Sequence, residues 1–520
     1  MAFAVGHQAS EEHAGAVKLA STEEAAAGTN TTKAVTPAGV LAAIEANTDI
    51  DARLLGVVFD GTNAAGTRTY GAANKTFTRS TDASAGTDTF AENPIFRGYY
   101  ALVKYNSTTQ KAEIVAKEGT AEYASIRAAG TEDYDEVRMF HVFWYKQTIS
   151  SDGKKTIVLS PMPLEGFKPS PMHYRNGVLH EWVGITRYPW GKDADATGGM
   201  AAKTGLYPLT NTTEANFYTN AKARGLRIFG ARELSSLQLL GNVKYANQNW
   251  QSACAQGYTN ANVNAVLRED TAGTNTAVID YSASNAQMFA VGRTLSFVDN
   301  RAAANVRNIT AIDTEYDTTN NYMKITFDGA VAPTMTAGTD KIYAGLAKNG
   351  TGDSIQGLDG YASSMHSSED KCTGKYLGIE NLFGNVNKAC SGIVRYDGSI
   401  WIKDDPDGDN TWLTTSYQTG WTRVCPSYDN SSGYIKKFNP TENMGEYDWL
   451  SSPSETGGTS SAPIGDYIWS NTTTNTVYMI GYGGDLRGGA SNGPFYWAAD
   501  NGVTNAYWYW GALGVFVPDL

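Results

Sequence analysis

The residues of this sequence with the clearest chemical potential lie near its C-terminus, between Gly481 and Gly514. This segment is rich in Tyr, Trp, Asp, Asn and Gly and contains no Lys, Glu or Gln. Tyr and Trp offer large amphipathic faces with little rotamer entropy to lose, and Asn, Ser and Gly add adaptable hydrogen bonds. The composition therefore favours non-covalent recognition of a protein surface or a sugar, with buried core strands as the alternative explanation.

The run from Ala506 to Trp510 alternates Tyr with Trp, so a strand here would place the two residue types on opposite faces. In a β-strand, Tyr507 and Tyr509 would lie on one face, and Trp508 and Trp510 on the other. One pair is then buried and the other exposed. We expect the tyrosines to face outward.

No catalytic constellation stands out in the sequence. The six histidines form no HxxxH pair, and no Walker pattern occurs. Four cysteines, Cys254, Cys372, Cys390 and Cys425, are widely spaced without a CxxC pair, which favours isolated buried thiols. We therefore expect no enzyme activity.

One acidic loop offers ligands for a hard cation. The loop 404–410 (DDPDGDN, from Asp404 to Asn410) places oxygen atoms at alternate positions around a glycine, as calcium sites do. No glutamate closes it at the twelfth position, so a solvated turn is the favoured interpretation. We expect no cofactor, with calcium as the one candidate.

Charge and hydropathy exclude two classes of partner. The net charge is −12, and no Lys/Arg cluster is longer than a pair such as Lys154-Lys155. The chain therefore lacks the basic patch that nucleic-acid binding requires. No stretch of about 18 apolar residues occurs, and the N-terminus has neither a basic nor an apolar signal region. We expect no membrane insertion and no signal peptide.

Length and composition predict a β-rich chain of several domains, of the α+β class. The chain has 520 residues, only 18% of them charged, with 54 glycines and 30 tyrosines. Residues 51–165 form a β-rich region, because LLGVVF, GYYALVKY, AEIVA and VRMFHVFWYK alternate or run apolar between turn-forming clusters. Residues 166–262 follow as a separate unit.

Two helices are predicted between Thr213 and Asn249. Leu234, Leu237 and Leu240 recur at helical spacing, so they form a core face. Gly225 ends the first helix. Residues 263–345 then form an inserted small β-sandwich or barrel, because five short strand patterns alternate with turn signals. We expect this insert to be a structural spacer.

The N-terminal segment, residues 1–50, resembles the short attachment repeat near the head of phage tail-fibre and tail-collar proteins. It contains Thr36-Pro37 and a short helical pattern but little apolar material to bury alone. The matching positions are Gly15, Val17, Leu19, Ala20, Glu24, Ala25, Gly28, Thr29, Ala34, Val35, Thr36, Pro37 and Gly39.

The helix pair and the later GIENLFGNV motif (378–386) resemble the C-type lectin fold in its formylglycine-generating-enzyme-like branch. This resemblance implies two helices, antiparallel strands and long loops, with residues 346–520 as the second half of the domain. Asn387-Lys388-Ala389 replaces the W-E-W that usually follows the motif, and no cysteine follows Cys425. The oxidase activity of that branch therefore lacks its nucleophile.

The segment 481–514 resembles the variable cassette of proteins diversified by retroelements. There, randomised adenines in AAY codons permit Tyr, Asp, Asn, Ser and Arg but exclude Trp. The resemblance implies a scaffold of Gly483, Gly484, Phe495, Trp497, Trp508, Trp510 and Gly511. It implies variable, receptor-contacting positions at Asp485, Arg487, Ser491, Asn492, Tyr496, Asp500, Asn501, Tyr507 and Tyr509.

Together these resemblances predict a bacteriophage receptor-binding protein located in the virion tail and made in the host cytoplasm. Its partners would be a bacterial surface receptor, protein or polysaccharide, and other tail proteins through residues 1–50. A homotrimer is expected, because multivalency converts weak single-site affinity into avidity. A fibre-borne enzyme such as a glycan depolymerase and a purely structural fibre spacer are the alternatives.

Overall fold

The structure is a computed structural model, and it describes residues 50–259, 264–365, 372–403, 420–425 and 431–518, apart from 472, 474 and 475, with five isolated residues nearer the N-terminus. The proposed calcium loop 404–410 and nearly all of the attachment segment 1–50 lie outside the described residues. The described chain is β-rich, as expected, and its strands form several sheets.

A six-stranded sheet joins distant parts of the chain in the order β17-β36-β14-β8-β6-β7. The C-terminal strand β36 pairs with β14 on one side and β17 on the other. The strands are β6 (Gly98–Asn106), β7 (Lys111–Lys117), β8 (Asp135–His141), β14 (Trp182–Thr186), β17 (Arg227–Ile228) and β36 (Gly514–Phe516). The expected boundary at 165/166 therefore does not separate two sheets, since β8 and β14 lie on opposite sides of it.

A five-stranded sheet lies beside the first, in the order β11-β9-β10-β1-β2. The segment VRMFHVFWYK, expected as one strand, is divided between β8 and β9, because the chain passes from one sheet to the other at Val142 and Phe143. The strands are β1 (Leu55–Phe59), β2 (Thr67–Tyr70), β9 (Trp144–Ile149), β10 (Lys155–Ser160) and β11 (Lys168–Pro169).

The C-terminal sheet carries the segment 481–514 and runs in the order β29-β28-β27-β33-β34-β32-β30-β31, with β35 beside β27. Most of its pairs are antiparallel, but β32 and β34 are parallel, with Trp469 opposite Ala498. The strands are β27 (Asn387–Tyr396), β28 (Ser399–Ile402), β29 (Thr422–Cys425), β30 (Gly433–Phe438), β31 (Pro453–Thr456), β32 (Tyr467–Ser470), β33 (Val477–Tyr482), β34 (Trp497–Gly502) and β35 (Trp510–Gly511).

The two predicted helices are confirmed as α5 (Glu214–Ala223) and α6 (Ala231–Tyr245). The Thr213 hydroxyl accepts from the amide of Asn216 and starts α5. The chain leaves α5 through Gly225, whose φ of +68° suits glycine. Helix α6 is buried along nearly its whole length and contacts β10, β1 and β27. It is the centre of a core that contains Leu55 and Leu513 alike.

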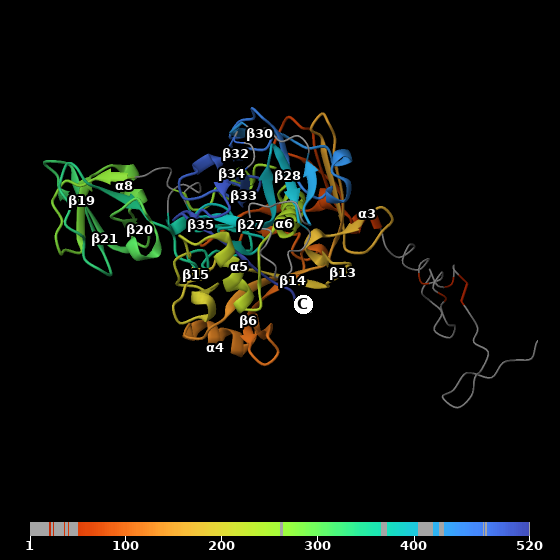
Figure 1. Ribbon diagram of the computed structural model, residues 1–520, viewed down its shortest axis with the longest axis horizontal. Coiled ribbons are helices and arrows are strands. Elements are labelled where there is room, and N and C mark those ends of the chain that lie inside the picture. Colours follow the sequence, from red (N-terminus) through yellow and green to blue (C-terminus); the bar gives the residue numbers. More distant parts are fainter. Residues whose placement is uncertain are drawn as a thin grey trace, which may run out of the picture.

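Residues between β18 and β23 form a separate lobe, drawn in green in Figure 1. Its sheet has the order β18-β23-β20-β21-β22-β19, and a bridge between Leu267 and Ile279 closes it into a small barrel. The lobe has its own hydrophobic core. Its elements are β18 (Asn264–Val266), β19 (Thr276–Asp280), α8 (Ala283–Met288), β20 (Thr294–Ser296), β21 (Val306–Asp317), β22 (Tyr322–Phe327) and β23 (Lys341–Ala344).

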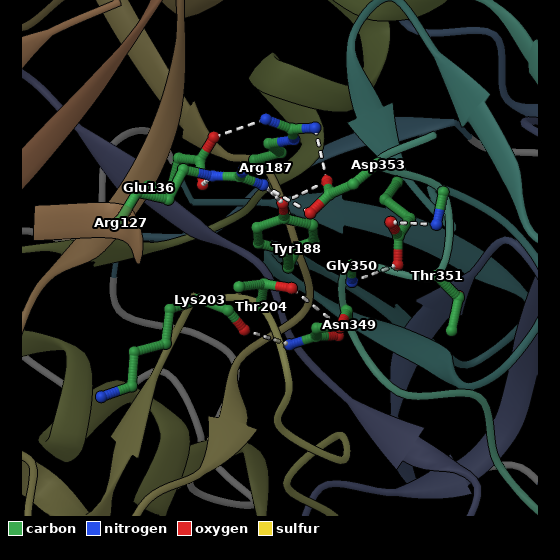
Figure 2. A network of polar contacts seen from close by, with 12 residues as sticks. Arg127, Glu136, Arg187, Tyr188, Lys203, Thr204, Asn349, Gly350, Thr351 and Asp353 are labelled. Carbon is green, nitrogen blue, oxygen red and sulfur yellow. Dashed lines mark hydrogen bonds and ion pairs between the residues drawn. The ribbon is translucent and has the colours of Figure 1, made fainter. Parts of the chain in front are cut away.

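A buried ionic network joins the segment that follows the barrel, called the return segment below, to the six-stranded sheet (Figure 2). Glu136 on β8 is fully buried and accepts from Arg127 of α4 (Ala121–Ala129) at 2.9 Å and from Arg187 at 2.5 Å. Both arginines also bind Asp353, and the Tyr188 hydroxyl donates to the same carboxylate at 2.6 Å. Each charge thus has opposite charges beside it, so its burial is compensated.

Backbone contacts of the same return segment complete this junction. The Asn349 side-chain amide donates to the carbonyl of Pro189 at 2.7 Å, and the Asn349 backbone carbonyl accepts from the backbone amide of Gly205. Glu380 accepts from the amides of Gly350 and Gly352, and burial raises its pKa to about 8. The return segment is therefore held at both side chains and backbone.

Replacing Glu136 by glutamine should destabilise the main body strongly. The substitution leaves Arg127 and Arg187 side by side with only Asp353 to neutralise them, and breaking a buried pair costs about 3 kcal/mol of the free energy of unfolding. Urea denaturation measures this difference. Glu181→Gln is the matched control, because that side chain is 69% exposed. An equal effect of the two substitutions would contradict a stabilising role of the network.

Candidate functional site

A cavity of about 380 Å³ opens in the C-terminal sheet beside the loop that joins β33 to β34. This volume lies within the usual range of small-molecule sites. Strand β34, the preceding loop 483–496 and the later loop around Tyr509 surround it, with one side chain each from β27 and β32. The lining residues are Asn387, Trp469, Asp485, Arg487, Gly488, Ser491, Tyr496, Ala498, Asp500, Asn501 and Tyr509.

Seven of the nine predicted contact positions line this one cavity: Asp485, Arg487, Ser491, Tyr496, Asp500, Asn501 and Tyr509. An eighth, Tyr507, lies beside it on the surface. Its ring stacks on that of Tyr509, with centroids 5.0 Å apart and planes inclined by 10°. The exposed Tyr507 ring forms a shelf next to the cavity entrance.

The expected strand alternation over 506–510 is wrong. Residues from Val503 to Tyr509 form turns and coil, and only Trp510 enters a strand, β35. A turn closed by the Trp510 amide and the Tyr507 carbonyl at 3.1 Å brings the two tyrosines to the same side. Trp510 is buried as expected, whereas Trp508 is half-buried and meets the Tyr509 ring edge-on.

Asn492, the ninth predicted contact position, is fully buried and does not reach the surface. Its side-chain amide donates to the carbonyl of Asp485 at 2.8 Å. A Cβ atom on Gly484 or on Gly488 would lie 1.8 Å from the Asn492 Oδ1, so both glycines are needed for the loop to wrap this side chain. Asn492 therefore fixes the loop from inside.

The expected scaffold residues lie beneath the cavity. Phe495, Trp497 and Trp510 are buried, and the absence of a side chain on Gly481 leaves room for the Trp510 indole, which a Cβ there would meet at 2.2 Å. Gly483 and Gly484 have φ of +85° and +73°, which lets the chain turn sharply out of β33.

A salt bridge between Arg487 and Asp485 forms one wall of the cavity. The guanidinium binds the carboxylate through Nη2 at 2.8 Å and Nε at 3.1 Å, and Asn387 donates to the same carboxylate at 3.2 Å. The guanidinium also lies over the Tyr509 ring, 4.0 Å from its centroid. Burial by itself would lower the pKa of Arg487, but the hydrogen bonds and charge of Asp485 outweigh it and raise that pKa.

Asp500 is the second carboxylate of the cavity, and it lacks a cationic partner among the described residues. Its one side-chain contact is with the Asn501 amide, which donates to Oδ1 at 2.7 Å. Burial raises the pKa of Asp500 above its ordinary value. The cavity therefore combines one neutralised carboxylate with one that is not neutralised.

The barrel contacts the far side of the Tyr507–Tyr509 loop. Arg301 of the barrel places its guanidinium 4.9 Å from the Trp508 ring centroid, and Arg487 lies 5.1 Å from the same ring. The amide of Asn211 also donates to the Tyr507 carbonyl at 3.0 Å. The loop is thus held from three directions, one of which is the insert that the sequence indicated to be a spacer.

Four lining residues were not predicted from the sequence. Gly488 and Ala498 lie within the segment 481–514 but have little or no side chain to signal a contact, and Asn387 and Trp469 lie outside that segment. Asn387 follows directly after the GIENLFGNV motif. Trp469 had no clear signal either, because Tyr467, Ile468 and Trp469 are all apolar in sequence and only the structure shows that Ile468 alone of the three is buried.

No protein-family model and no curated protein matches this chain. Among the described residues no group of three His, Cys, Asp or Glu side chains is arranged to hold a metal ion, and none of the described helices has the length and apolar character of a membrane span.

One catalytic pattern occurs at the cavity, since Gly489–Gly493 (GASNG) has the spacing G-x-S-x-G. The structure places Ser491 at the end of a short 3-10 turn, where its hydroxyl donates to the Gly488 carbonyl at 2.6 Å. No histidine lines the cavity as the structure describes it. The strand-to-helix elbow that makes such a serine a nucleophile is not formed here.

Replacing Arg301 by alanine should loosen the Tyr507–Tyr509 loop without unfolding the barrel. The substitution removes the guanidinium that lies over the Trp508 ring. The Trp510 amide, which donates to the Tyr507 carbonyl and closes the loop, should then exchange its hydrogen at least about threefold faster. Hydrogen-exchange mass spectrometry measures this. Lys324→Ala, which removes another cation–aromatic contact of the barrel, should leave that amide unchanged. Equal exchange in both variants would show that the barrel does not support the loop.

Proposed function

We propose that this chain is a receptor-binding protein of a bacteriophage tail fibre, and that the cavity with the Tyr507–Tyr509 shelf is its recognition surface. One observation supports this most directly. Positions that the codon rule of retroelement-diversified proteins permits to vary converge on one cavity, while positions that it excludes, such as Trp497 and Trp510, are buried below it. Variation at the cavity would then change specificity while the scaffold stays intact.

The proposed fold of the main body is a C-type lectin-like domain interrupted by the barrel. The helix pair, the antiparallel sheets and the long loop between β33 and β34 support this proposal. The pairing of β36 with β14 and β17 also supports it, because it brings the end of the segment 481–514 back into a sheet made by earlier residues.

The proposed assembly is a homotrimer attached to other tail proteins through residues 1–50 and located in the virion. Aromatic shelves of this size recognise a receptor weakly one at a time, and three linked copies gain avidity when their sites can engage together. The receptor is a protein or polysaccharide of the bacterial surface.

Two substitutions test the recognition surface. Tyr507→Ala removes the exposed shelf, and Ala498→Leu fills the cavity, so each should weaken binding of the purified full chain to host cells by about tenfold, as for a moderate interface hot spot. Flow cytometry with labelled protein measures the binding.

Tyr174→Ala is the control, because Tyr174 on β12 (Tyr174–Arg175) is an exposed tyrosine away from the cavity. A structural spacer predicts that none of the three substitutions changes binding. A depolymerase predicts instead that the purified protein degrades host glycans. Either result would overturn the proposed function.

The trimer has a direct test in solution. Multi-angle light scattering of the full chain should give three times the chain mass of 55.9 kDa, and removal of residues 1–50 should lower that mass if the attachment segment contributes to assembly. A mass of one chain for the intact protein would contradict the trimer and leave the recognition surface to be judged by cell binding alone.

A further inference from the structure

The charges around the cavity do not cancel. Asp485 is fully engaged, because Arg487 binds both of its oxygens and Asn387 donates to it as well. Asp500 has only the Asn501 amide, so the cavity retains one negative charge. A half-buried carboxylate without a cation is unfavourable, and an incoming positive charge would relieve that cost.

Among the described residues, the two cationic side chains nearest the cavity are both committed to other partners. Arg487 is committed to Asp485 and to the Tyr509 ring. Lys388, next to Asn387 on β27, donates to the carbonyl of Gly384 at 2.6 Å, and burial lowers its pKa well below the ordinary value. Neither side chain forms an ion pair with Asp500 in the described structure, so this carboxylate is available to a cationic group of a ligand.

An exposed aromatic side chain lines the same cavity as this carboxylate. Trp469 is 45% exposed and stands opposite Ala498 in the parallel pair β32–β34. Asp500 follows Ala498 by two residues on β34, past an irregularity in the strand register, and the small Ala498 side chain lines the cavity with both of them. Cations bind favourably against tryptophan faces, and more so beside a carboxylate.

The rest of the lining is polar in a way that suits hydroxyl groups. Ser491, Asn501 and Asn387 offer a hydroxyl and amides, and the Asp485–Arg487 pair offers further charged donors and acceptors. A long aliphatic chain such as that of lysine would find little apolar surface here beyond the aromatic rings. A polyhydroxylated ring with one cationic substituent matches both the polar lining and the unpaired charge.

We propose that the cavity binds an amino sugar with a free ammonium group, which lies between the Asp500 carboxylate and the Trp469 ring. The inference rests on the proposed recognition function of this surface and specifies its ligand class. The ring hydroxyls then contact Ser491 and Asn501, and the Tyr507 shelf receives the neighbouring part of the receptor.

The test uses the full chain and three soluble probes in ligand-observed NMR titrations at neutral pH, because burial raises the pKa of Asp500 and acid would neutralise its carboxylate. D-glucosamine should bind at least about tenfold more tightly than N-acetyl-D-glucosamine, which has the same ring without the charge. It should also bind more tightly than Nα-acetyl-lysine methylamide, and its affinity should fall as salt is added. Equal binding of the two sugars, or tighter binding of the lysine analogue, would overturn the assignment.

Two variants and one control locate the binding. Asp500→Asn keeps the shape of the side chain and should reduce glucosamine affinity at least about tenfold without a change in melting temperature, and Trp469→Ala should reduce it as well. Glu92→Gln, an exposed carboxyl outside the cavity, should bind as the parent chain does. Unchanged affinity in a folded Asp500→Asn variant would place the ammonium elsewhere and overturn the proposal.

The outcome separates this inference from the function on which it rests. If Tyr507→Ala weakens host-cell binding but glucosamine is not preferred, the ligand class is wrong and the recognition surface stands. If glucosamine binds at Asp500 but no cavity variant changes host-cell binding, the adhesin function is wrong and the sugar site stands.

Discussion

The main body depends on the buried carboxylate of Glu136 and the two arginines that it shares with Asp353. Glu136 belongs to the six-stranded sheet, whereas Asp353 follows the barrel by only a few residues. A long insertion costs little free energy, because loop-closure entropy grows only slowly with length. The rest of the fold forms around an inserted domain when the two ends of that domain lie close together. The network fixes the segment that leaves the barrel against the six-stranded sheet, so the chain resumes β27 and the C-terminal sheet from a fixed point.

The recognition surface consists of a buried frame and of side chains that line the cavity above it. Buried Trp497, Trp510 and Asn492 hold the loop from below, and glycines at 481, 484 and 488 permit their close approach. The side chains that line the cavity differ in how far they are part of this frame: Tyr496 and Asp485 are buried in it, whereas Asp500, Asn501 and Ser491 are partly exposed. Arg487 joins the cavity wall to Asp485, Trp508 and Tyr509. Substitution at Arg487 would therefore alter both shape and charge.

The sequence predicts those parts of the fold in which the spacing of apolar residues along the chain determines the secondary structure. The periodic leucines of α6 and the short alternating strands of the barrel are of this kind. The prediction failed where tertiary contacts override a local pattern. The run 137–146 (VRMFHVFWYK) contains no Gly, Pro, Asn or Asp that would mark a turn, so nothing in it reveals that the chain changes sheets at Val142. The alternation at 506–510 resembles a strand, yet a turn stacks Tyr507 on Tyr509. For the site, composition located the segment, but only the structure brings Trp469 beside it.

The position of β36 also constrains how the molecule is made. The Gly514 amide donates to the Thr186 hydroxyl across a separation of 328 residues, and β36 lies between β14 and β17. During synthesis, the edges of β14 and β17 that pair with β36 therefore stay unpaired until residues 514–516 have left the ribosome. Such long-range pairing is slow, and open edges invite association with other chains. Nascent molecules with open β14 edges are the species in which a chaperone would be needed most, and incomplete chains should aggregate there first.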